Sequence, residues 1–192
     1  MGYTIAERGL VEPLLAAVTE LILNEAHYER LIREAIPAAK RFVWIATADL
    51  KDLHVAGAGG RFVPFVGVLA DLVRQGVEVR LIHAKEPGPR FREDFDKHPE
   101  LIESELFERV LCPRMHAKIV IVDGLTAYVG SANLTGAGIG AKASHRRNFE
   151  AGMLVRDDPG TLGELMSFLD RLWIGEFCEK CGRRDVCPDP IA

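Results

Sequence analysis

The chain has 192 residues, of which 48% are hydrophobic and 27% are charged, as expected of one domain folded around a buried core. This composition excludes a disordered tail, a collagen-like repeat and a small disulfide-stapled scaffold. The net charge of −4 excludes binding to nucleic acid through a uniformly basic surface. The sequence has neither an apolar run of membrane-spanning length nor a secretory signal pattern at its start, so we expect a cytoplasmic protein without membrane contact.

The first 40 residues are predicted to form helices that pack on the domain that follows. Apolar residues recur at helical spacing over Val11–Leu23 and again over His27–Ala39.

Strands and helices alternate through residues 41–176, which predicts a single α/β layered domain. The segments of strand-like composition are Arg41–Ala48, Val77–His83, Phe107–Leu111, Ala117–Val122, Ala127–Val129 and Asn148–Val155. The segments of helical pattern are Phe62–Gln75, part of His98–Leu106, and Pro159–Trp173. Residues 49–61 and 86–97 are predicted to be loops, and residues 177–192 form a tail that contains cysteines.

Basic residues concentrate in one part of this acidic chain. The stretch from Arg109 to Arg156 has seven basic and two acidic residues, a net +5, so the remaining residues carry −9. A positive island on an acidic body draws anions to one place, although chance clustering on a solvated surface would give the same pattern. The candidates to contact substrate phosphates are Arg114, His145, Arg146 and Arg147.

The candidate chemistry lies between Met115 and Gly138. His116 and Lys118 are two residues apart in a predicted strand, so both side chains face one side of the sheet. An imidazole beside an ammonium has no obvious role in a core, and it suits a nucleophile or acid next to a group that binds phosphate oxygens. In the small-residue loop that begins at Gly130, Ser131 and Asn133 add further hydrogen-bond donors.

Seven residues at fixed spacing resemble the HKD motif and the supporting glutamate of the phospholipase D superfamily: His116, Lys118, Asp123, Gly130, Ser131, Asn133 and Glu150. The resemblance covers roughly residues 41–173. It implies a phospholipase D-like α/β/α sandwich with a mixed sheet, formed by residues 41–176. The active site of this family takes two HKD motifs, whereas this sequence has one. Single-motif members, such as the small bacterial endonucleases of the family, complete the site by pairing, so the resemblance implies a homodimer with a composite active site.

The resemblance also implies a role for each site residue. One His116 attacks the phosphorus to form a phosphohistidine, and the partner subunit's His116 protonates the leaving oxygen and later activates water. Lys118, Asn133 and Ser131 hold the phosphate oxygens, so catalysis needs no metal. Glu150 orients a His116 ring and raises its basicity. Asp123 is the sixth candidate catalytic residue, although its place in a turn favours a structural role.

The four cysteines are predicted to bind a metal: Cys112, Cys178, Cys181 and Cys187. The tail has the spacing C-x2-C-x5-C, and Cys112 would supply the fourth ligand and hold the tail beside the active centre. This pattern resembles the iron–sulfur staple of RecB-like nucleases. Zinc binds the same ligands, and a chain without metal is the third alternative. In either metal case the role would be structural.

The favoured function is a metal-independent nuclease that cuts DNA or RNA. One alternative is a phospholipid phosphodiesterase or transferase, which would need an apolar membrane-facing surface that the sequence lacks. The other is a non-catalytic subunit that binds phosphate within a larger nucleic-acid-processing or defence complex.

Overall fold

The computed structural model describes residues 17–51, 53–57 and 60–191. Its strands are β1 (Val18–Leu23), β2 (Phe42–Thr47), β3 (His54–Ala56), β4 (Phe62–Pro64), β5 (Glu78–His83), β6 (Phe107–Leu111), β7 (Ile119–Val122), β8 (Thr126–Gly130) and β9 (Ala151–Arg156). Its α-helices are α1 (Phe65–Arg74), α2 (Pro89–Phe95), α3 (Glu100–Glu103) and α4 (Pro159–Trp173). Further helical segments are Tyr28–Ala35, Ile36–Ala38, Ser144–Arg146 and Arg184–Val186.

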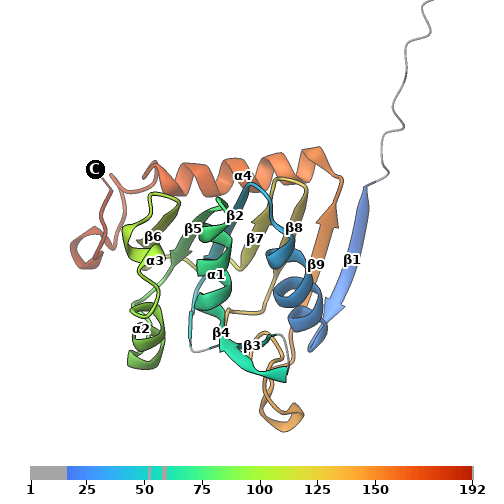
Figure 1. The fold of residues 1–192 in the computed structure, drawn as a ribbon. Coiled ribbons are helices and arrows are strands. Elements are labelled where there is room, and N and C mark those ends of the chain that lie inside the picture. The colour runs from blue at the N-terminus through green and yellow to red at the C-terminus, as the bar shows by residue number, and fades with distance from the viewer. Residues whose placement is uncertain (1–16, 52, 58–59, 192) are drawn as a thin grey trace, which may run out of the picture.

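Seven of the strands form one mixed sheet in the order β1-β9-β8-β7-β2-β5-β6 (Figure 1). The strands β2, β5 and β6 are parallel, and every other neighbouring pair is antiparallel. The remaining strands, β3 and β4, form a separate hairpin. The predicted mixed sheet is therefore confirmed.

Helices cover both faces of the sheet, because the central strands are apolar on both sides. Val43 and Ile45 of β2 pack into a core that includes α1, α2, α3 and the helical segment Tyr28–Ala35. The alternate residues Trp44 and Ala46 pack with α4, which runs across the other face (Figure 1). This arrangement confirms the predicted α/β/α sandwich.

The helix predicted over Val11–Leu23 is wrong for its second half. Residues 18–23 form the edge strand β1, which pairs with β9 in register from Val18 opposite Arg156 to Leu23 opposite Ala151. A short apolar run fits either period, and pairing with β9 decides between them here. The first half of the predicted helix lies outside the described residues.

Proline and glycine account for two further differences. The helix predicted from Phe62 begins only at Phe65, because Phe62–Pro64 pair with β3 and Pro64 precedes the first helical residue. The predicted loop 86–97 contains α2, which starts with Pro89 in its first turn after Gly88.

The topology brings several strand ends to one edge of the sheet. The carboxyl ends of β2, β5 and β6 lie there, beside the start of β7, the end of β8 and the start of β9. Open α/β sheets bind ligands at the carboxyl ends of their parallel strands. No helix among the described residues is long and apolar enough to cross a membrane.

Candidate active site

His116 and Lys118 come immediately before β7 rather than within a strand, because β7 begins at Ile119. Ala117 and Ile119 pack against the α4 side of the sheet. Lys118 is 8% exposed, and its Nζ donates to the backbone carbonyl of His116 at 2.7 Å. The side chain of His116 is exposed. The imidazole of His116 is therefore accessible to a substrate, while the ammonium of Lys118 is bonded to the backbone of His116.

Asn133 is oriented by the end of β2. Its Oδ1 accepts from the backbone N–H of Asp49 at 3.1 Å and from the hydroxyl of Thr47 at 3.3 Å. Because the amide oxygen is used in this way, the NH₂ group of Asn133 remains the donor for a substrate oxygen. The hydroxyl of Thr47 also accepts from the backbone N–H of Leu134 at 3.3 Å, which fixes the loop itself.

Ser131 and Glu150 meet where β8 ends and β9 begins. The hydroxyl of Ser131 donates to Glu150 Oε2 and accepts from the backbone N–H of Ala151 at 3.1 Å. The side-chain amide of Asn148 donates to Glu150 Oε1 at 3.0 Å. Both carboxylate oxygens therefore have a donor, and Glu150 is held in one orientation.

Asn24 supports Glu150 from the end of β1, although no motif in the sequence points to it. Its backbone N–H donates to the carbonyl of Glu150 at 2.9 Å, and its Oδ1 accepts from the backbone N–H of Glu150 at 3.1 Å. The buried ring of His27 lies 2.8 Å from the carbonyl of Asn24 and packs edge-to-face on Tyr128. Burial lowers the pKa of His27, which favours the neutral ring. The backbone φ of Asn24 is 46°, a conformation that asparagine tolerates better than most residues.

Close packing explains why the loop starts with glycine. A Cβ at Gly130 would collide with the hydroxyl of Tyr128 and lie 2.8 Å from the carbonyl oxygen of Ala151. That hydroxyl accepts from the backbone N–H of Ala132 at 3.2 Å. Burial raises the pKa of Tyr128 to about 12, so the ring stays neutral. Tyr128 therefore shapes the loop that carries Ser131.

Asp123 lies at the other end of β7, away from His116. Its carboxylate accepts from the backbone N–H groups of Lys40, Arg41 and Phe42 at 2.8, 2.8 and 3.0 Å. Burial by itself would raise the pKa of Asp123, but these three hydrogen bonds bring it below its ordinary value. Asp123 thus lies in the turn after β7, at the edge of the sheet opposite His116, with its carboxylate bonded to the backbone that begins β2.

The first and the last of the seven basic residues counted from Arg109 to Arg156 are paired with acidic residues in the structure. Arg109 pairs with Glu86 at 3.4 Å, and Arg156 pairs with Glu20 at 2.9 Å at the far end of β9. Both charges are compensated by acidic residues outside the counted stretch.

The predicted phosphate-contacting run lies in the long loop between β8 and β9, which projects from the site edge (Figure 1). His145 and Arg146 are exposed in the helical turn Ser144–Arg146. Arg147 turns back and pairs with Glu25 at 3.4 Å. Of the three side chains, His145 and Arg146 therefore face solvent, whereas the charge of Arg147 is compensated.

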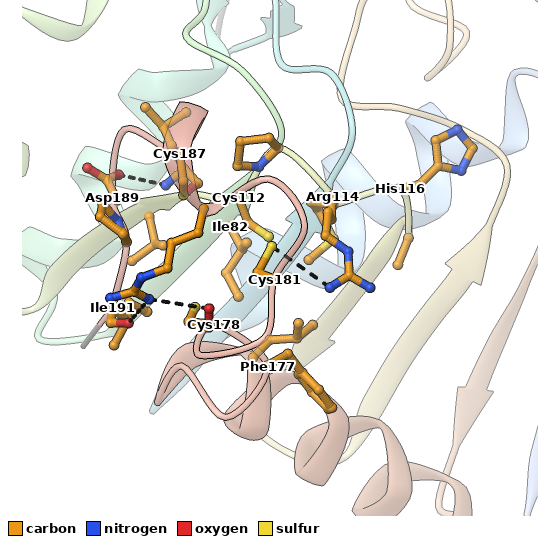
Figure 2. A pocket seen from close by; sticks show the side chains of 18 of the residues that line it. Ile82, Cys112, Arg114, His116, Phe177, Cys178, Cys181, Cys187, Asp189 and Ile191 are labelled. Carbon is orange, nitrogen blue, oxygen red and sulfur yellow. Dashed lines mark hydrogen bonds between the residues drawn. The ribbon is translucent and has the colours of Figure 1, made fainter.

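The four cysteines line one cavity of about 320 Å³. Arg114 and His116 line the same cavity, and the Arg114 guanidinium lies 3.9 Å from the sulfur of Cys181 (Figure 2). Arg114 is exposed and contacts the C-terminal tail through this sulfur. Within the described residues, no three His, Cys, Asp or Glu side chains lie close enough together to hold a metal ion as they stand.

Comparison with known proteins shows the family and the fold of the chain. Residues 32–173 match the family model described as "Cardiolipin synthase, PLD-like domain". Among solved structures, NucT from Helicobacter pylori superposes with a TM-score of 0.59 at 15% identity, covering 81% of this chain and 94% of that one. Nuc from Salmonella typhimurium, a phospholipase D family member, gives 0.58 at 16% identity, covering 82% and 94%.

A phosphatidylserine synthase from Haemophilus influenzae Rd KW20 shares the fold with a TM-score of 0.53 at 14% identity, covering 81% of this chain and 38% of that one. The sequence has no match among curated proteins.

Proposed function

The chain belongs to the phospholipase D-like family, and from this premise we propose that it is a metal-independent nuclease that hydrolyses DNA or RNA at a site shared by two copies. The observation that carries the proposal is an exposed imidazole at His116, with the buried Lys118 ammonium bonded to its backbone and an oriented Asn133 amide at the same edge of the sheet.

The proposed reaction has two steps at the phosphorus. A ring nitrogen of His116 forms a bond to phosphorus while the bond from phosphorus to the leaving oxygen breaks, and the partner subunit's His116 gives that oxygen its proton. Water then attacks the phosphohistidine and gives a proton to the same partner imidazole, and the bond between nitrogen and phosphorus breaks. Lys118 and Asn133 stabilise the charge on the non-bridging oxygens in both steps.

Two observations support a second copy at this edge. The chain has one HKD motif, so a single copy offers one nucleophile and no matching acid. The same edge exposes apolar side chains: Phe149 is 97% exposed, and Val129 and Met153 on neighbouring strands are each 37% exposed. A second copy would cover these side chains and bring its own His116 to the phosphate.

Nucleic acid is favoured over lipid by size and by charge. The chain covers 94% of NucT and of Nuc but only 38% of the phosphatidylserine synthase. His145 and Arg146 are exposed in the loop that connects β8 to β9, and we infer that they contact phosphates outside the cleaved bond.

Cleavage in the presence of EDTA tests the proposal. Purified protein is incubated with labelled single- and double-stranded DNA and RNA, and with phosphatidylcholine vesicles. We expect nucleic acid to be cut, and His116→Ala to lower the rate by about 10³-fold or more with an unchanged melting temperature, because the side chain is exposed. His98→Ala, at a half-buried histidine between α2 and α3, is the matched control and should keep full activity. Cleavage of vesicles alone, or cleavage that survives His116→Ala, would contradict the proposal.

A further inference from the structure

We propose that Cys112, Cys178, Cys181 and Cys187 bind one metal centre through four thiolates, and that this centre fixes the C-terminal tail against the segment that leads to His116. The ligand chemistry is that of zinc(II) or of an iron–sulfur cluster, which use the same soft donors. The inference does not depend on the nature of the substrate.

The first support is convergence. These are all the cysteines of the chain, and all four line the same cavity. Cys112 follows the last residue of β6, whereas the other three come from a tail more than 60 residues later in the sequence. Figure 2 shows the tail folded over the end of β6, with Cys112, Cys178, Cys181 and Cys187 around one space.

The second support is that bonds without any thiol hold the tail in this place. Asp189 Oδ2 accepts from the backbone N–H of Leu111 at 2.8 Å, and Arg183 donates to the backbone carbonyl of Pro113 at 3.2 Å. These contacts bracket Cys112 on the one side and Cys187 on the other. The tail that carries three of the cysteines is therefore placed beside Cys112 by the fold of the chain and not by an assumed metal.

The third support is that the tail buries little apolar surface of its own. Residues 177–191 form turns and one short helical segment, and most of their side chains are exposed. Such a short segment cannot bury a core of its own, and small units of this kind are commonly stabilised by a metal. The four cysteines are only half-buried, so apolar packing does not explain their grouping.

The surroundings suit a negatively charged centre. Four thiolates around a divalent ion leave a net charge of −2, and Arg114 and Arg184 line the cavity with them. Since no three ligands among the described residues are close enough as they stand, binding requires the thiols to turn inward. Rotation of a cysteine about χ1 moves its sulfur between three staggered positions, and the cavity that the four cysteines line has a volume of about 320 Å³.

Metal analysis of the intact protein is the primary test, because it needs no variant. The full chain is purified without oxygen or chelator, and zinc, iron and acid-labile sulfide are measured per chain together with the visible absorption spectrum. We expect either one zinc per chain without visible absorption, or iron with sulfide and a visible band. Less than one-tenth equivalent of metal, with all four thiols open to alkylation in the native protein and no zinc taken up on refolding, would overturn the proposal.

Variants then test which side chains are ligands. Cys112→Ser and Cys181→Ser should each lose most of the metal and lower Tm by about 5 °C or more, since a ligand that binds only the folded chain stabilises it. Asp189→Asn is the control, because it weakens the contact of the tail with Leu111 and leaves every thiol in place. It should retain the metal. Full metal content in Cys112→Ser would overturn the four-thiolate arrangement even if the other variant failed to fold.

Discussion

At the scale of single residues, the side chains that we propose to contact the substrate are oriented by neighbours outside the proposed contact. Asn133 can present its NH₂ group only while its oxygen is engaged by Thr47 and by the backbone of Asp49. Thr47 is buried at the end of β2. Its hydroxyl lies 3.3 Å from Asn133 Oδ1 and 3.0 Å from the carbonyl oxygen of Asp49, and it accepts from the backbone N–H of Leu134. We therefore assign Thr47 as a positioning residue.

Removing this hydroxyl should slow the chemical step without weakening substrate binding. Thr47→Val keeps the shape of the side chain but takes away the hydrogen bond to Asn133 Oδ1. We expect kcat to fall about tenfold with KM nearly unchanged, as for the loss of a bond of about 1.4 kcal/mol that matters in the transition state. Steady-state cleavage kinetics measure both constants.

The conservative variant separates positioning from packing. Thr47→Ser restores the hydroxyl and loses only the methyl group, so its kcat should return to within about twofold of the wild type. If Thr47→Ser were as slow as Thr47→Val, the methyl packing would be the important feature, and the assignment would be wrong.

The residues of the site were predictable to different degrees. Fixed spacing in the sequence was enough to single out His116, Lys118 and Asn133, because so many polar residues rarely fall at these intervals by chance. Thr47 and Asn24 were not predictable, since their roles arise from contacts across 86 and 126 positions of the chain. A threonine at the end of a strand and an asparagine in a turn are ordinary in sequence.

At the scale of elements, Asp123 joins β7 to the start of β2. Its carboxylate accepts three backbone N–H groups from Lys40 to Phe42, which would otherwise lack partners at the beginning of a buried strand. The backbone of Asp123 has φ of 56°, a region that Asp and Asn enter more readily than other side chains.

Asp123→Asn tests this structural role, because it keeps the backbone preference and removes the charge and one acceptor. We expect a loss of about 1–3 kcal/mol in the free energy of unfolding at neutral pH. Cleavage activity per folded molecule should stay at the wild-type level, since Asp123 lies at the edge away from His116. A large loss of activity in a fully folded variant would restore Asp123 as a catalytic residue.

The same variant predicts the direction of a pH effect. The pKa of Asp123 is lower in the folded chain than its ordinary value of 3.8, so its contribution is complete above that value and is lost as the pH falls toward the folded pKa. The stability difference between the wild type and Asp123→Asn should therefore shrink as the pH falls below 3.8. Urea unfolding at a series of pH values measures it.

The bounds of an element were predicted best where residues at its own ends define them. The helix over Pro159–Trp173 appears with the predicted bounds, because Asp158 caps it and Pro159 opens it. The edge strand β1 was missed, because its partner β9 follows it by more than 120 residues. Local periodicity carries no information about such a partner.

At the scale of the whole molecule, one chain supplies half of the proposed site. An exposed nucleophile at His116 has no second imidazole from its own motif, and Phe149 beside Glu150 is almost fully exposed. If two copies close on one phosphate, a copy that lacks His116 should disable the partner with which it pairs. Independent chains would show no such effect.

Mixing the wild type with His116→Ala under conditions that allow subunits to exchange distinguishes these cases. Only pairs of two wild-type chains would be active, so activity should fall with the square of the wild-type fraction. Equal parts would retain about a quarter of the activity of the same total amount of wild type, against about half if each chain acts alone. Mixing with His98→Ala, which keeps the motif intact, should leave the activity unchanged. A linear fall with His116→Ala would show that a single chain completes the reaction, and the shared site would have to be abandoned.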